Sequence, residues 1–152
     1  MKTTRTALIV SAWLVVSGLA QAAEPVEITV YKSPTCGCCE KWISHLEANG
    51  FKVTPQNMND TGMVKAMSGI RPETASCHTG IVNGYVIEGH VPATDVKRFL
   101  AEKPDALGLS APGMPQGSPG MEQGGQHDNY RVLLLKKDGS TEVYAEHGPA
   151  FD

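Results

Sequence analysis

Three of the four cysteines in this chain fall within positions 36–39, as Cys36, Cys38 and Cys39. A segment rich in β-branched residues, 26–31, precedes them, and a segment with apolar residues at helical spacing, 40–49, follows. A thiol cluster in this place lies at the N-terminus of a helix, where the positive end of the helix dipole favours thiolate over thiol. Because thiolates attack disulfides and bind soft metal ions, the motif predicts a redox site, a metal site or both.

The spacing of the cysteines allows both kinds of chemistry. Cys36 and Cys39 form the Cys-x-x-Cys pair of dithiol oxidoreductases, which makes them the candidate catalytic residues. Disulfide exchange does not need Cys38, and crowded thiolates must be neutralised by protons, disulfides or a bound cation. Soft thiolates favour Cu(I), zinc and iron–sulfur clusters. Three sulfurs at one helix start are poorly spread for a single tetrahedral ion, so we expect them to bridge several copper ions.

The elements that must position this motif follow in the order β-α-β-α-β-β-α. Strands are expected over residues 26–31, 51–54, 79–82 and 85–88, and helices over residues 40–49, 59–68 and 92–103. The dipeptide Asn83-Gly84 predicts a hairpin between the last two strands, and the first strand–helix–strand unit predicts a parallel pair. This is the order of a thioredoxin-like α/β core. In that fold the segment before the third strand, which carries Cys77 here, packs against the cysteine motif.

A region dense in glycine and proline follows the last of these helices. Residues 108–126 are expected to form a loop, either a flexible linker or a flap that returns to the site. In the second interpretation Met114 and Met121 are thioether ligands for Cu(I). Residues 130–135 and 140–145 then predict a second hairpin, because an Asp-Gly turn lies between them.

Several other soft or basic side chains have a structural explanation beside a metal-binding one. Met63 and Met67 could ligate a soft ion, but their helical spacing predicts that they face the core. His78, next to a cysteine, is expected with equal weight to ligate a metal or to form a hydrogen bond in the core. His90 is expected to be structural, and His147, taken by itself, to be a surface residue.

The first 22 residues have the features of a secretory signal peptide. The start is basic, residues 6–20 are mostly apolar, and Ala20-Gln21-Ala22 fits the small-x-small cleavage pattern. The apolar run is shorter than the roughly 20 residues of a membrane span, so we expect cleavage after Ala22 and no membrane attachment afterwards. Without Lys2 and Arg5 the chain keeps 11 of its 13 basic residues against 16 acidic ones. A net charge of −5 excludes a nucleic-acid footprint, and export predicts the oxidising periplasm.

Four ordered motifs resemble those of the CopG-type family of periplasmic copper-resistance proteins. They are Tyr-Lys-Ser-Pro-Thr-Cys-Gly-Cys-Cys (31–39), Ala-Ser-Cys-His-Thr (75–79), Gly-Tyr-Val-Ile-Glu-Gly-His-Val-Pro (84–92) and Pro-Gly-Met-Pro-x-Gly-Ser-Pro-Gly-Met-Glu (112–122). The resemblance implies a thioredoxin-like fold that binds copper through its Cys-x-Cys-Cys motif, with help from the C-terminal extension, and a role in copper redox interconversion. It carries Cys36, Cys38, Cys39 and Cys77 over as copper ligands, with His147 as a further candidate in the extension.

We therefore expect a signal peptide (1–22), a thioredoxin-like domain (23–107) and a C-terminal extension that packs near the cysteine site (108–152). The expected function is that of a periplasmic copper-binding oxidoreductase whose cysteine-bridged cluster cycles between Cu(I) and Cu(II). One alternative is non-catalytic copper sequestration or delivery to an efflux system, and another is a metal-free disulfide oxidoreductase. The expected partners are copper ions and a copper efflux system or redox partner, and the chain is expected to be a monomer.

Overall fold

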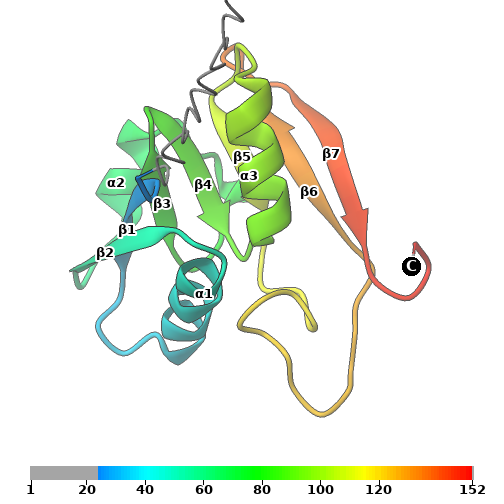
Figure 1. The fold of residues 1–152 in the computed structure, drawn as a ribbon. Helices are drawn as coiled ribbons and strands as arrows, with labels where there is room; N and C mark the ends of the chain where they lie inside the picture. Colours follow the sequence, from blue (N-terminus) through cyan, green and yellow to red (C-terminus); the bar gives the residue numbers. More distant parts are fainter. Residues whose placement is uncertain (1–23, 152) are drawn as a thin grey trace, which may run out of the picture.

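The computed structural model describes residues 24–151 of the chain (Figure 1). The expected signal peptide, residues 1–22, lies outside the described residues. In chain order the elements are β1 (Glu27–Lys32), α1 (Gly37–Ala48), β2 (Lys52–Asn57), α2 (Gly62–Met67), the 3₁₀ helix η1 (Pro72–Thr74), β3 (Thr79–Val82), β4 (Tyr85–Gly89), α3 (Ala93–Glu102), β5 (Gly108–Ala111), β6 (Tyr130–Leu135) and β7 (Thr141–His147). Among these residues, no helix is both long enough and apolar enough to cross a membrane.

The predicted order of strands and helices is confirmed from β1 to α3. β1 and β2 form the expected parallel pair, with Ile28 opposite Val53. β3 and β4 form the expected antiparallel hairpin. Its turn residues Asn83 and Gly84 both have positive φ, 49° and 81°, which is the conformation that favours the Asn-Gly pair in a tight hairpin. The α/β class is therefore confirmed, and the assignment to a thioredoxin-like fold stays a prediction.

All seven strands belong to one mixed sheet, in the order β2-β1-β3-β4-β5-β6-β7. The expectation that residues 108–126 are loop throughout is wrong at its start, because β5 pairs in parallel with β4. Gly108 permits this pairing, since a Cβ atom there would lie 1.8 Å from the carbonyl oxygen of Val86. The expected second hairpin is confirmed as β6 and β7, which pair antiparallel and continue the same sheet.

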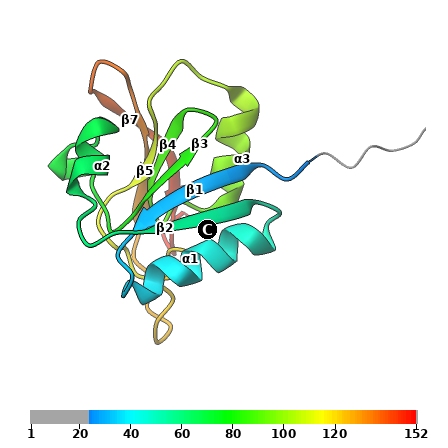
Figure 2. The same ribbon diagram turned by 90° about the vertical axis from the view of Figure 1, so that its left-hand side faces the viewer.

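Helices α1 and α3 cover one face of the sheet, and α2 lies on the other (Figures 1 and 2). The main core lies under α1 and α3. It joins the apolar stripe of α1 (Trp42, Ile43 and Leu46) to strand residues that include Leu109 and Val132. A smaller cluster on the opposite face contains residues 70, 86 and 135. β1, β3 and the first turn of α1 are thus anchored to a core that includes strands from both halves of the chain.

The prediction that Met63 and Met67 face the core is wrong. Both are on the outer side of α2, where 73% and 82% of their surface is exposed. The inner side of this short helix is used by Lys65, whose ammonium group pairs with the fully buried carboxylate of Glu88 and donates to Thr79 Oγ1 over 3.1 Å. A buried carboxylate needs a counter-charge, and a helix of six residues can turn only one side to the sheet.

Candidate metal centre

The cysteine motif lies in the turn between β1 and α1 and in the first turn of the helix. α1 begins at Gly37, with Cys36 as its N-cap residue, three residues before the expected start. Cys38 and Cys39 are therefore within the first helical turn, where unpaired backbone N–H groups favour negative charge. Cys36 and Cys39 are joined by a disulfide, while Cys38 and Cys77 are free thiols.

The fold brings all four cysteines to one point. The Sγ atoms of Cys36 and Cys38 are 3.5 Å apart, and those of Cys39 and Cys77 are 3.6 Å apart. All four sulfurs lie within 4.8 Å of one another. Cys77 comes from the segment before β3, as the order of elements predicts, because the antiparallel pairing of β3 with β1 sets the start of β3 beside the end of β1.

Two buried histidines complete a second group of donor atoms around the same cysteine. The Cys77 Sγ atom is 3.2 Å from His78 Nδ1 and 3.1 Å from His90 Nε2. Both imidazoles are fully buried, and the ring of His78 lies 4.3 Å from that of Trp42. Sequence reasoning left the role of His78 open and gave His90 only a structural one. The direct neighbour Cys77 was the signal for His78, whereas no local pattern marks His90.

The hydrogen bonds of the two histidines define which nitrogen atoms are available. His90 Nδ1 lies 2.8 Å from the carbonyl oxygen of Pro119. Since a carbonyl only accepts, Nδ1 carries the proton and the lone pair of Nε2 points at Cys77. Burial lowers the pKa of His90, and burial followed by the neighbouring His90 lowers the pKa of His78 further. His78 Nε2 has no hydrogen-bond partner among the described residues. Both rings are thus neutral, the form in which imidazole binds metals.

The surroundings of Cys77 disfavour its thiolate form. Burial, and after it repulsion from Cys38, raises the pKa of the Cys77 thiol to about 12. A bound cation stabilises a thiolate in such a place and displaces its proton. Thiolates and neutral imidazoles are the ligands that Cu(I) and zinc prefer. The donor set therefore fits a soft or borderline metal ion.

A buried carboxylate holds the segment that carries Cys77 and His78. Glu88 in β4 accepts the backbone N–H of Ser76 over 2.7 Å and the hydroxyl of Thr79 over 2.7 Å. These two residues directly flank the Cys-His pair. Since Lys65 balances the charge of the carboxylate, the contacts fix the backbone on both sides of two candidate ligands.

A buried lysine holds the cysteine motif itself. Lys32, the last residue of β1, is fully buried. Its ammonium group pairs with Glu40 in the first turn of α1 and donates to Asn57 Oδ1 over 2.9 Å. It also donates to the carbonyl oxygen of Ser33 over 3.3 Å. The contacts connect the end of β1, the turn and the start of the helix, so the position of the cysteines follows from the strand that precedes them.

The Gly/Pro-rich loop after β5 packs against the site. Gly113 forms a bridge with Ser76, and Pro119 accepts the hydrogen bond of His90. Gly120 lies so close to α1 that a Cβ atom there would be 2.8 Å from the Cys38 carbonyl oxygen. Met121 beside it is buried, with 6% of its surface exposed, and Met114 is 54% exposed. Ligation by either thioether stays a prediction.

His147 lies on β7, and its ring is held by another pair of side chains. Its Nε2 atom is 2.6 Å from a carboxylate oxygen of Asp95 in α3, and its ring stacks on Tyr130 with the centroids 5.1 Å apart. It is absent from the groups of converging Cys, His, Asp and Glu ligand atoms among the described residues. A metal-binding role for His147 stays a prediction.

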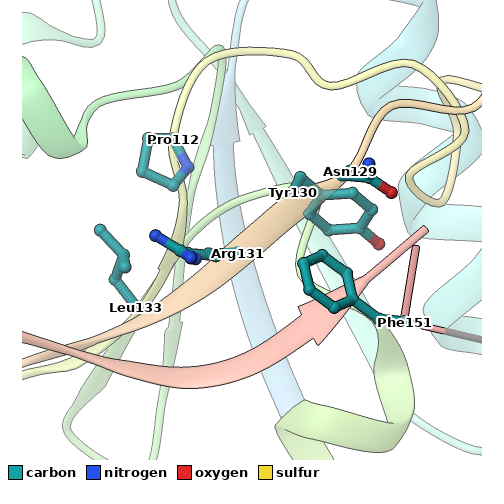
Figure 3. A pocket seen from close by; sticks show the side chains of 6 residues that line it. All are labelled: Pro112, Asn129, Tyr130, Arg131, Leu133 and Phe151. Atoms are coloured by element: carbon teal, nitrogen blue, oxygen red, sulfur yellow. The ribbon is translucent and has the colours of Figure 1, made fainter. Parts of the chain in front are cut away.

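A hollow of the described surface is lined by residues other than the cysteines. It has a volume of about 460 Å³ and is lined by Pro112, Asn129, Tyr130, Arg131, Leu133 and Phe151 (Figure 3). No sulfur ligand or imidazole borders it. The donor atoms of the cysteine cluster lie close together and outside this hollow. Such a compact set of donor atoms suits an ion better than an organic substrate.

Comparisons with known proteins agree with a metal-related role. Residues 74–121 match a family described as "Protein of unknown function, DUF411". Two solved structures, "Copper resistance protein copG" in forms 1 and 2, are each 48% identical to this chain, with a TM-score of 0.78. The matches cover 82% and 83% of this chain and 99% and 100% of those chains. No curated protein matches.

Proposed function

Because this chain belongs to the CopG-type family of copper-resistance proteins, we propose that it binds copper in a thiolate-bridged cluster and interconverts Cu(I) and Cu(II) as part of copper resistance. The observation that carries the proposal is the convergence of Cys36, Cys38, Cys39 and Cys77, whose sulfurs lie within 4.8 Å of one another. Copper is the substrate here, and the cysteines are its ligands.

The number of donors supports more than one copper ion. Four sulfurs and the two imidazoles beside Cys77 exceed the four ligands of a tetrahedral site. A thiolate has several lone pairs and can bridge two soft ions. We propose that Cys38 is such a bridge, because its thiol is free and lies 3.5 Å from Cys36 Sγ.

The redox step uses the Cys36–Cys39 pair. Two Cu(II) ions take one electron each from the two thiolates, which join as a disulfide while both ions become Cu(I). In the reverse direction two Cu(I) ions return the electrons, the S–S bond breaks and two thiolates form. The Cys36–Cys39 disulfide supports this pair as the electron reservoir.

Several finer assignments belong to the same proposal. We propose Met114, Met121 and His147 as further copper ligands from the C-terminal extension. The protein acts in the periplasm after cleavage of residues 1–22, as a monomer whose β1–α3 segment is a thioredoxin-like core. The close approach of Gly120 to α1 supports Met121, its neighbour in the chain, as one of these ligands.

The two alternatives differ from this proposal in turnover and in metal content. Copper sequestration or delivery to an efflux system needs the cluster but no redox change. A metal-free disulfide oxidoreductase needs only the Cys-x-x-Cys pair at the helix start, and the observed disulfide is the feature that favours it.

The test is copper analysis of protein loaded under reducing, anaerobic conditions and again in air. We expect more than one copper ion per reduced chain. Addition of Cu(II) to the reduced protein should yield one Cu(I), measured with a Cu(I)-specific chelator, for each thiol lost. Bound copper without thiol loss would favour sequestration, and disulfide exchange without retained copper would favour the metal-free enzyme.

A further inference from the structure

We propose that Met63 and Met67 form a second, exposed Cu(I) site on α2, which accepts the ion from a donor molecule before it reaches the cysteines. The identity of the ion rests on the proposed function. The site itself rests on a separate observation, the position of two thioethers on the outer side of this helix.

The two methionines are placed together by the helix and left uncovered by the fold. They are four residues apart in α2 (Gly62–Met67), a spacing at which side chains are neighbours on one face. Their exposed fractions are 73% and 82%. The other exposed positions of the helix, Gly62 and Ala66, have small side chains that leave both sulfurs accessible.

The exposure of both methionine side chains also excludes a structural role for this pair. Helical spacing allowed either a core role or a metal-binding role, and the exposed fractions remove the first. Lys65, about half a turn away on the wheel, makes the contacts that attach α2 to the sheet, through Glu88 and Thr79. The methionines are therefore free of any task in holding the helix.

Thioether chemistry selects the ion and makes the site weaker than the cysteine cluster. A thioether is a neutral, soft ligand that suits Cu(I) and discriminates against hard cations. It binds without losing a proton, and two of them leave room for a ligand of the donor molecule. Anionic thiolates bind Cu(I) more strongly, so ligand exchange from the methionines to the cysteines runs downhill with no change in oxidation state.

The methionine pair is connected to the cysteine motif through Lys65 and its partners, although α2 and α1 lie on opposite faces of the sheet. Lys65 of α2 contacts Thr79, which pairs with Tyr31 at the end of β1, one residue before the strand ends. Glu88, the other partner of Lys65, holds Ser76 next to Cys77. The exposed site is thus attached to the segment that carries a cluster ligand.

The first test is NMR of the full-length mature protein with 13C-labelled methionine methyl groups, titrated anaerobically with Cu(I) as its acetonitrile complex. Spectra of Met63→Leu and Met67→Leu assign the signals. We expect both methyl signals to shift, while that of Met58, half-buried and outside the helix, stays in place. Methyl signals of both residues that do not move would overturn the site, whether or not the cysteines bind copper.

The second test is the rate at which the reduced protein takes copper from the same complex. Leucine keeps the apolar surface and removes only the sulfur, so the double variant Met63→Leu/Met67→Leu should load several-fold more slowly and reach the same final copper content. Met58→Leu is the matched control and should load at the wild-type rate. An unchanged rate in the double variant would overturn the role in transfer, whereas a chain that retains no copper at its cysteines would instead contradict the proposed function.

Discussion

Cys38 and Cys77 are the two thiols that a simple disulfide exchanger would not need. Cys38 lies in the first turn of α1, and Cys77 precedes β3 and is held between two imidazoles. The disulfide between Cys36 and Cys39 leaves both of them reduced. At the scale of single residues, the distinction between a metal cluster and a dithiol enzyme therefore depends on what these two thiols bind.

Replacing Cys38 with serine separates the two functions. Serine has nearly the same shape, but its hard and usually neutral oxygen is poorly matched to Cu(I). We expect Cys38→Ser to keep the Cys36–Cys39 disulfide, to change the free energy of unfolding by less than about 1 kcal/mol and to bind fewer copper ions per chain. Metal analysis beside a thiol count on wild type and variant is the measurement. Full copper loading together with lost disulfide exchange would refute the bridging role.

Glu88 allows a test of how the ligand segment is held. Glu88→Gln leaves Lys65, which is only 14% exposed, without its counter-charge, and we expect a loss of about 2–4 kcal/mol in the free energy of unfolding. Copper affinity should fall as well, because glutamine has one acceptor oxygen where Glu88 uses two, one for the Ser76 backbone N–H and one for the Thr79 hydroxyl. Urea unfolding and copper titration are the measurements. Glu146→Gln, in the exposed pair with Arg131, is the matched control and should cost less than about 1 kcal/mol.

The cysteines of the site could be predicted from the sequence, and His78 was an open candidate, whereas the place of His90 beside them could not be predicted. Three cysteines fall within positions 36–39, and the order of elements brings Cys77 to them. The orientation of His90 depends on the carbonyl of Pro119, 29 positions away, and no periodic pattern reports such a contact. The same holds for His45 in α1. Its Nε2 accepts the backbone N–H of Ala93 at the start of α3 over 3.0 Å.

At the scale of elements, the loop after β5 can pack closely against α1 because Gly120 has no side chain. Gly120 has a φ of 87°, and its α-carbon faces the backbone of the first two turns of the helix. Backbone contact of this kind sets the distance between the loop and the cysteine motif. It also explains why Pro119 can reach His90.

Gly120→Ala tests this close approach. The added methyl group would lie 2.8 Å from both the Cys38 carbonyl oxygen and the Trp42 nitrogen, so the loop must move away. We expect a cost of about 2 kcal/mol or more in the free energy of unfolding and faster modification of Cys77 by a thiol reagent. Gly124→Ala is the control, because that residue has a positive φ of 59° but open space around it. Equal thiol reactivity in the two variants would contradict the role of the contact.

The two elements that differ from prediction do so because distant partners decide them. β5 is a strand because β4 and β6 lie on either side of it, although Gly108 and its surroundings have the composition of a loop. The side of α2 that faces the sheet is determined by the buried Glu88 rather than by the spacing of hydrophobic residues. Hairpins and long amphipathic helices are determined by residues close together in the sequence, and their bounds were predicted within a few residues.

At the scale of the whole molecule, the sheet does not end where the predicted domain ends. β5, β6 and β7 extend it beyond residue 107, and Leu109, Ala111 and Val132 are fully buried in the core that α1 and α3 share. The predicted domain boundary at residue 107 therefore follows the order of elements. Because the core extends across this boundary, we do not expect it to mark the end of a unit that folds alone.

A chain that ends at Leu107 should not fold. Each large apolar side chain in this core contributes about 1.5–3 kcal/mol through burial, and losing β5 and β6 also uncovers the residues beneath them. Against a net stability of about 5–15 kcal/mol, we expect circular dichroism to show no cooperative thermal transition. A chain that ends at His147 is the control and should melt close to wild type, since Phe151 is 45% exposed. A cooperative transition in the shorter chain would establish residues 24–107 as an autonomous domain.

The Cys36–Cys39 disulfide has a further consequence through the entropy of the unfolded chain. Its partners are three positions apart, and so short a ring restrains the unfolded chain by only about 2 kcal/mol. A bond between Cys39 and Cys77, whose sulfurs are 3.6 Å apart across 38 positions, would restrain it by about 4 kcal/mol. Reduction of the Cys36–Cys39 bond thus removes about half of the restraint that reduction of a Cys39–Cys77 bond would remove. Migration of the bond to Cys77 would instead be visible as a rise in melting temperature. Thermal stability therefore reports which pair of cysteines forms the disulfide.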